Sequence, residues 1–291
     1  MLTQFILNGL STGGIYALVA VALGVAYRTF GFFDFAHAAF FAVSAYVAFI
    51  SAAWFHCLLP VEIGIAIGVG ALCAVAYHKA ILIPLQHRQA AKPVMLLASL
   101  GVFIVLEALL MVIFGAEAKS FSRLTTTEGI QLLGGRLTVV QIASSITCIA
   151  VVSLWGCVMA FSRIGLIWQS LASSRELAEV VGVQAEKASR LAFMAAGCTV
   201  GLAGILQAHD TGLTPSMGFG VLLVALVAVV AGGNSIIANV IAAVSLAVLQ
   251  QIASLLLPTH WQDAVVFFVL AVFLLLRPTG VFGRTGDRMS A

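Results

Sequence analysis

Few side chains in this sequence could do chemistry, because 62% of the residues are hydrophobic and only 9% are charged. Glu107 stands near the middle of the apolar run SLGVFIVLEALLMVIFG, where a charge in a membrane is costly. Such a carboxyl is expected to be protonated or paired, and to face protein or a wet cavity. Two interpretations are open: a residue of a translocation path, or a buried hydrogen-bonding strut.

Asp34 and His37 form a second candidate pair, in the stretch FFDFAHAAF. They are three residues apart, so a helix that begins there places both on one face. Asp34 is also suited to cap the N-terminus of that helix, since its carboxylate accepts bonds from free amides. We interpret Asp34 as a cap. The alternative is a catalytic or proton-relay pair, and both residues are candidates for a translocation path.

The stretch AGGNSIIAN, with Gly232, Gly233 and Asn234, interrupts two apolar runs. Two glycines and an asparagine break a helix at or near the membrane. Broken helices line the pathways of transporters, so these three residues are further candidates for the path. The alternative is a tight turn between two spans.

Enzymatic chemistry has no support in the pattern of residues. There is no GxSxG motif, no P-loop and no histidine pair at metal-binding helical spacing. The five cysteines lie mostly in apolar runs and form no CxxC, which favours packing over metal or disulfide roles. We therefore predict no catalytic residue, no metal, no cofactor and no nucleic-acid partner.

The elements that position these residues are predicted to be membrane-spanning helices. Mean hydropathy is +1.13, and apolar runs recur at about 20 residues, the length that crosses about 30 Å of hydrocarbon as a helix. The sequence predicts a single all-α domain over 1–291, a polytopic transmembrane helical bundle of about eight or nine spans. A short run near the C-terminal half predicts a broken or re-entrant helix. The expected spans are roughly 5–27, 35–55, 61–83, 94–114, 137–161, 187–208, 216–231, 236–257 and 261–276.

Basic residues in the loops predict the orientation. The loop 84–93 carries Arg88 and Lys92 without an acid, and 162–190 and the C-terminal tail are also rich in basic residues. The positive-inside rule places all three in the cytoplasm, with the N-terminus outside and the C-terminus inside. The loop 115–136 must then face outside despite its own basic residues.

Three small-xxx-small patterns predict close helix packing. Packing within one chain is the preferred interpretation, and a subunit interface is the alternative. The pairs are Gly9 with Gly13, Gly64 with Gly68, and Gly197 with Gly201.

One long polar segment stands out, because seven charged side chains lie between Arg163 and Arg190. Its pattern predicts two short helices around a hinge, with an apolar stripe and a C-terminal cap at Gly182. An apolar stripe in the cytoplasm needs a cover: lipid, the protein's own bundle, or a groove on a soluble partner. The mixed charges weaken the lipid interpretation and favour a docking helix for a partner. The stripe is formed by Leu166, Ile167, Leu171, Leu177, Val180 and Val181.

The order small–Arg–Ile–Gly, Ala, Ala, Val–Gly–Val over 162–183 resembles the cytoplasmic coupling segment of permeases of the branched-chain amino acid type of ABC importer. Other stretches of this family are similar along nearly the whole chain, the terminal RPTG and the Gly-Gly pair being the most specific. The sequence differs from the family at three places. The family usually has basic residues at the positions of Leu166 and Gln169 and an acid near Ser174, and its NFAHG stretch is DFAHA here. These differences predict a divergent subfamily with altered contacts to its ATPase. The similar stretches are 8–28, 32–48, 202–219, 230–243 and 274–283.

The resemblance implies a permease subunit in a bacterial inner membrane, surrounded by lipid, that performs no bond chemistry. Its implied partners are two cytoplasmic ABC ATPases, a second related permease or a second copy of this chain, and a periplasmic binding protein that delivers the substrate. Branched-chain amino acids, urea, amides and other small carboxylates are all open as substrates. The residues implied in ATPase coupling are Arg163, Gly165, Ala172, Arg175, Glu176, Glu179 and Gly182.

Two other classes of function compete with this one. A secondary transporter would couple to an ion through Glu107 or Asp34, and would need no ATPase. An intramembrane enzyme or scaffold is the third, but no paired nucleophile and base and no metal triad favours it. Neither alternative requires the polar segment at 163–190.

Overall fold

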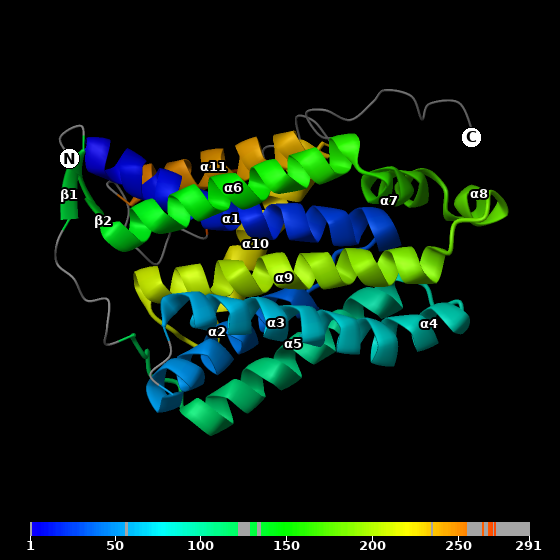
Figure 1. Cartoon of the computed structure of the whole chain (residues 1–291), viewed down its shortest axis with the longest axis horizontal. Helices are drawn as coiled ribbons and strands as arrows, with labels where there is room; N and C mark the ends of the chain where they lie inside the picture. Colours follow the sequence, from blue (N-terminus) through cyan, green and yellow to red (C-terminus); the bar gives the residue numbers. More distant parts are fainter. Residues whose placement is uncertain are drawn as a thin grey trace.

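The structure is a computed structural model that describes residues 2–55, 58–121, 129–132, 135–233, 235–254, 264, 267–269 and 271. It is an elongated bundle of helices with one small hairpin (Figure 1). Its elements are α1 (Leu2–Phe30), α2 (Ala36–Phe55), α3 (Leu59–Tyr77), the π-helical turn η1 (His78–Leu82), α4 (Ile83–His87), α5 (Lys92–Phe114), β1 (Gly129–Leu132), β2 (Gly135–Thr138), α6 (Val139–Phe161), α7 (Arg163–Ser173), α8 (Arg175–Val180), α9 (Ala185–Thr211), α10 (Met217–Gly232) and α11 (Ile236–Ala253).

The predicted all-α membrane fold is confirmed. Among the described residues, seven helices are long and apolar enough to cross a membrane, and α10 is a shorter apolar helix. Its 16 residues extend about 24 Å, less than the thickness of the hydrocarbon layer. These eight helices match the first eight predicted spans, whereas the ninth, 261–276, lies almost entirely outside the described residues.

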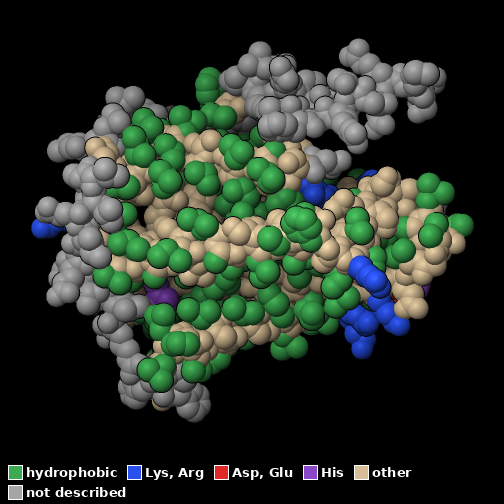
Figure 2. Space-filling view, turned by 45° about the horizontal axis from the view of Figure 1, so that its top comes forward, with side chains coloured by type: hydrophobic (Ala, Val, Ile, Leu, Met, Phe, Trp, Pro, Cys, Tyr) green, Lys and Arg blue, Asp and Glu red, His purple; other side chains and the backbone are tan. Residues whose placement is uncertain are grey.

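The helices α1 and α9 form the centre of the bundle. In their apolar stretches 78% and 72% of the residues are buried, against 17% in α5 and in α6. The helix α9 packs on α1, α2 and α3, while α1 packs on α6, α9, α10 and α11. The outer helices therefore present apolar faces to the surroundings, and Figure 2 shows hydrophobic side chains along the length of the visible face.

Glycines set the closest helix contacts, and they confirm two of the three predicted packing patterns within the chain. Gly197 and Gly201 of α9 lie directly against the backbone of α3. Gly9 and Gly13 of α1 lie against α11. The third pattern was wrong as an internal contact: added Cβ atoms at its two glycines would meet nothing within 4 Å, because on α3 it is Gly70 that faces α9.

The two ends of the bundle differ. One end carries α7 and α8, together with the end of α1 and the start of α9, and we call it the α7 end (Figure 1). The opposite end carries the β1–β2 hairpin, which the sequence did not predict. There Gln4 of α1 fixes the hairpin by donating to the carbonyl of Arg136 at 2.7 Å and accepting from its amide at 2.6 Å. The short elements thus lie at the two ends of the bundle, and the long apolar helices run between them.

Candidate functional site

The α7–α8 segment begins with a capped helix pressed against α6. The hydroxyl of Ser162 accepts a bond from the amide of Gly165 at 3.0 Å, which satisfies one of the free donors of the first turn of α7. Gly165 is buried, and a Cβ there would lie 2.7 Å from Cα of Met159 and still closer to the carbonyl of Val158. Gly165 thus allows α7 to fold back onto the end of α6.

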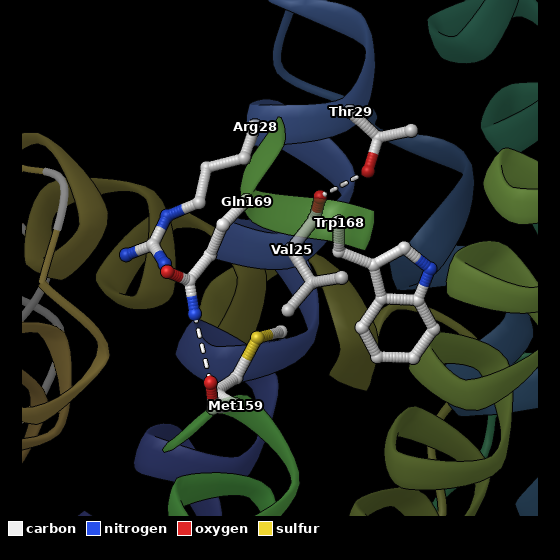
Figure 3. Close-up of a pocket in the computed structure, with 6 residues that line it drawn as sticks. All are labelled: Val25, Arg28, Thr29, Met159, Trp168 and Gln169. Carbon is white, nitrogen blue, oxygen red and sulfur yellow. Dashed lines mark hydrogen bonds between the residues drawn. The ribbon is translucent and has the colours of Figure 1, made fainter. Parts of the chain in front are cut away.

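Two side chains of α7 bond directly to the bundle, and Figure 3 shows the bond made by one of them, Gln169. The indole Nε1 of Trp168 donates to the carbonyl of Ala188 in α9 at 2.9 Å. The amide Nε2 of Gln169 donates to the carbonyl of Met159 in α6 at 2.7 Å. Trp168 is 7% exposed, and its ring lies 5.7 Å from that of Trp155. Together with the buried Leu171, these contacts fix the inner face of α7.

A positive charge lies behind this inner face. Arg28, in the last turn of α1, extends alongside Gln169 in Figure 3 and lines a cavity of about 10 Å³, which is the size of one water site. Its Nε and Nη2 are buried and make no hydrogen bond to any residue that the structure describes. The sequence did not single out Arg28, because its position depends on how α1 meets α7.

The break between α7 and α8 falls at Ser174. Ser174 is extended, at φ −159° and ψ 115°, and its hydroxyl accepts from the amide of Leu177 at 3.4 Å. The predicted C-cap is confirmed: Gly182 has φ +95°, its amide donates to Glu179, and the amide of Val183 donates to Ala178, both at 3.0 Å. This is a Schellman motif. Residues 185–190 belong to the first turns of α9 rather than to the polar segment.

The outer face of the segment, which we call the outer ridge, is apolar and uncovered. The predicted single stripe was wrong, because Leu171 is buried against the bundle while the rest of the stripe, apart from the partly buried Ile167, points outward. Within the part of the chain that the structure describes, nothing covers these side chains. The outer ridge consists of Leu166, Leu177, Val180 and Val181, which are 61%, 67%, 83% and 84% exposed.

The predicted coupling residues divide between the two faces of the segment. Gly165 is buried and Gly182 shapes the turn, whereas Arg163, Ala172 and Glu179 are exposed. Arg175 and Glu176 begin α8, and their side chains are not among those that the structure describes. Figure 2 shows Lys and Arg side chains gathered at this end of the bundle.

Asp34 and His37 come together inside the core. Oδ2 of Asp34 lies 3.1 Å from Nδ1 of His37, and the two side chains are 1% and 0% exposed. Oδ1 of Asp34 accepts from the amide of Ala36 at 2.9 Å, so the predicted cap is confirmed. The His37 ring packs against Phe40 and Phe193. The pair therefore lies among core aromatic rings rather than on the surface of the chain.

The other candidates for the path lie elsewhere. Glu107 is half-buried on α5, and no hydrogen bond or ion pair joins it to another residue that the structure describes. Gly232 lies directly against Asn239, and Gly233 ends α10 at φ +61°. Asn234 lies outside the described residues. The structure does not gather these residues with Asp34 into one site within a single chain.

A buried pair at the hairpin end was missed by the sequence. Oε2 of Glu62, in the first turn of α3, lies 3.4 Å from Nε2 of His209, in the last turn of α9. The ring of Phe121 covers His209 at a centroid distance of 4.0 Å. These residues are far apart in the chain, so no local pattern indicates that they meet.

Comparisons with known proteins identify the family predicted from the sequence. High-affinity branched-chain amino acid transport system permease protein LivH of Escherichia coli (strain K12) is 27% identical over 300 residues, covering 97% of this chain and 95% of that protein. The permease protein BraD of Pseudomonas aeruginosa is 24% identical over 298 residues, with the same coverages. A chain in the solved structure of PsaBC from Streptococcus pneumoniae in complex with Fab is 15% identical, covers 94% of this chain and 90% of that chain, and has a TM-score of 0.48, too low to show a common fold.

The family model described as "branched-chain amino acid transport system / permease component" matches residues 5–274. This match takes in the central helices, the α7–α8 segment and α10–α11. The chain therefore belongs to the family of branched-chain amino acid transport system permease components.

Proposed function

We propose that this chain is the transmembrane permease subunit of an ATP-driven importer, and that it takes up branched-chain amino acids or a related small polar solute delivered by a periplasmic binding protein. Its family and the names of its relatives support the transport role. The observation that carries the coupling role is the outer ridge on α7 and α8, which is apolar and exposed. It belongs to a segment whose first helix, α7, is bonded to the bundle.

The outer ridge docks into a groove on a cytoplasmic ABC ATPase, one ATPase for each permease. Hydrophobic side chains on a short helix are typical anchors for a groove on a partner. Arg163, Ala172 and Glu179 lie on the exposed surface of the same segment and flank the contact. The partner ATPases hydrolyse ATP, and this chain converts their movement into a change of access.

The α7 end faces the cytoplasm of a bacterial cell, and the hairpin end faces the periplasm. The supporting observation is charge: a turn and the helix ends at the α7 end carry Arg88, Lys92, Lys187 and Arg190, and basic residues near the ends of spans favour the cytoplasmic side. The membrane is the inner membrane, and its lipid covers the outer helices. Glu62 and His209 then lie beneath the surface that receives the binding protein.

A second permease, related to this chain or identical to it, completes the path. In the described part of the chain, the core is filled by α1 and α9, which pack on each other and are mostly buried. The outer face of α3, where added Cβ atoms at Gly64 and Gly68 would meet nothing within 4 Å, suits a close helix contact between subunits. Glu107 and the α10–α11 connection remain our candidates for residues along the path, with Asp34 and His37 behind it in the core.

The first test is purification of the tagged protein in mild detergent, with identification of the proteins that co-elute. The double variant Val180→Asp/Val181→Asp places two charges on the outer ridge and should release the ATPase. Gln184→Glu adds a charge at an exposed position of the neighbouring turn and should not. Retention of the ATPase by the double variant would show that it docks elsewhere.

Uptake in proteoliposomes separates this function from ion-coupled transport. With the ATPases and the binding protein present, solute should enter only when ATP is supplied, and collapse of the proton and sodium gradients should leave the rate unchanged. Uptake that follows an ion gradient without ATP would exclude the importer and favour the secondary transporter.

A further inference from the structure

The first turn of α9 receives two buried hydrogen bonds from different elements. Trp168 of α7 donates to the carbonyl of Ala188 at 2.9 Å. At the next residue, the hydroxyl of Ser189 lies 3.3 Å from Nε2 of His78. Because Ala188 and Ser189 are consecutive, α7 and the first residue of η1, which continues α3, contact the same turn of α9.

The direction of the second bond follows from the proton of Ser189. Its hydroxyl donates to the carbonyl of Glu186 at 3.0 Å, which uses its one proton. The nitrogen Nε2 of His78 must therefore carry the proton and donate to Ser189. His78 is 0% exposed, and its ring packs against Phe30 and Phe193, so this side chain has little freedom to turn away.

His78 is also the first residue of a change in helix type. The α-helix α3 ends at Tyr77, η1 continues as a π-helical turn over His78–Leu82, and α4 follows with Pro84 in its first turn. A π-helical turn within a helix frequently marks a functional site, and proline removes a backbone donor. The regular α-helix is therefore interrupted at His78, the residue that bonds to α9.

The packing on either side of this point differs. Before His78, α3 lies against α9 backbone to backbone, with Gly70 and Ala74 facing Gly197. After η1, α4 has no buried residue. The main part of α3 must then move with α9, whereas α4 is free to follow a different course, and η1 is the place where the two can bend.

The contacts of α7 with α6 are poor routes into the core, whereas α7 also packs on the central helix α1. Gln169 and Gly165 contact α6, but α6 is joined to α7 through the single residue Ser162 and belongs to the outer layer. The bond from Trp168 instead reaches the central helix α9.

We propose that the first turn of α9 is the junction through which a displacement of α7 reaches the π-helical turn of α3, with Trp168 and His78 as the positioning residues on its two sides. This inference rests on the proposed function, since it takes the displacement of α7 to come from the ATPase. It names the part of the permease that responds first: the bend between α3 and α4.

The test uses the reconstituted complex of permease and ATPases with two variants, one for each bond. Trp168→Phe keeps an aromatic ring but removes the indole donor. Ser189→Ala removes the acceptor of His78 with a minimal change of volume. The matched control is Thr199→Val, which removes the acceptor of another buried indole, the 2.9 Å bond from Trp155 to Thr199 between α6 and α9. It removes no hydrogen bond of α7 and keeps both indole rings of the Trp155–Trp168 contact.

Two quantities are measured: the change in amide hydrogen exchange over residues 78–87 when ATP binds, and the number of ATP molecules hydrolysed per solute imported. In the parent complex ATP should alter exchange in this segment. Each variant should reduce that change and raise the ATP cost about fivefold, the effect of one lost buried hydrogen bond on an equilibrium. Thr199→Val should change neither quantity.

The outcomes that would overturn the inference are distinct from those that would overturn the proposed function. If both variants keep the ATPase bound and give parental exchange and parental ATP cost, the junction is wrong while the docking stands. The same holds if Thr199→Val produces an equal loss. If the parent chain binds no ATPase at all, the proposed function fails and this inference fails with it. Ser189→Ala decides the matter should Trp168→Phe fail to fold.

Discussion

Replacement of Gly165 by alanine should separate α7 from α6. The added Cβ would stand 2.7 Å from Cα of Met159 and 3.0 Å from its carbonyl oxygen, and closer still to the carbonyl of Val158. All three are backbone atoms, so no side chain can move aside to make room. Overpacking of this kind costs about 1–3 kcal/mol, and α7 must shift outward to relieve it.

The shift has a second consequence for α7. The bond from Gln169 to the carbonyl of Met159, now 2.7 Å, spans the same contact and must lengthen as α7 moves. Loss of one such bond costs about 1 kcal/mol. We therefore expect Gly165→Ala to lower the free energy of unfolding of the purified permease by about 2–4 kcal/mol in total, and to weaken retention of the ATPase.

The measurement is denaturant unfolding in detergent, followed by intrinsic tryptophan fluorescence, together with ATPase co-purification. The control is Gly156→Ala on α6, about one turn before Met159, where a Cβ would meet nothing within 4 Å. That change should be neutral or should stabilise the helix by up to about 1 kcal/mol. Equal stability and equal ATPase retention for Gly165→Ala and the parent would refute the account of how α7 is held.

Two further substitutions test other parts of the structure. Gly182→Ala places a side chain at φ +95°, which should cost about 1–2 kcal/mol and fray α8. Weaker ATPase binding is expected with only a small fall in melting temperature, and unchanged binding would mean that the Schellman turn does not shape the docking surface. Gly197→Val drives a side chain into the backbone of Gly70 and into Ala74 and should prevent stable folding in detergent, whereas Gly68→Val, facing outward on α3, should fold. A well-folded Gly197→Val protein, judged by size-exclusion chromatography, would contradict the close packing of α3 on α9.

The sequence by itself determined that the chain lies in a membrane, and it determined where several of its helices begin and end. Apolar runs of membrane-spanning length predicted eight helices to within a few residues, because a helix in hydrocarbon must satisfy its backbone internally whatever its neighbours are. Asp34 as a cap and Gly182 as a C-cap were also correct, since both depend only on bonds within a few residues.

Only the tertiary structure decided which faces meet. Lipid and protein interior are both apolar, so a spanning helix carries little periodicity to show which side is buried. For this reason the sequence could not tell that Gly70, rather than Gly64 and Gly68, faces α9. Nor could it show that Trp168 bonds to α9 while Val180 stays exposed, because each depends on where a distant helix lies.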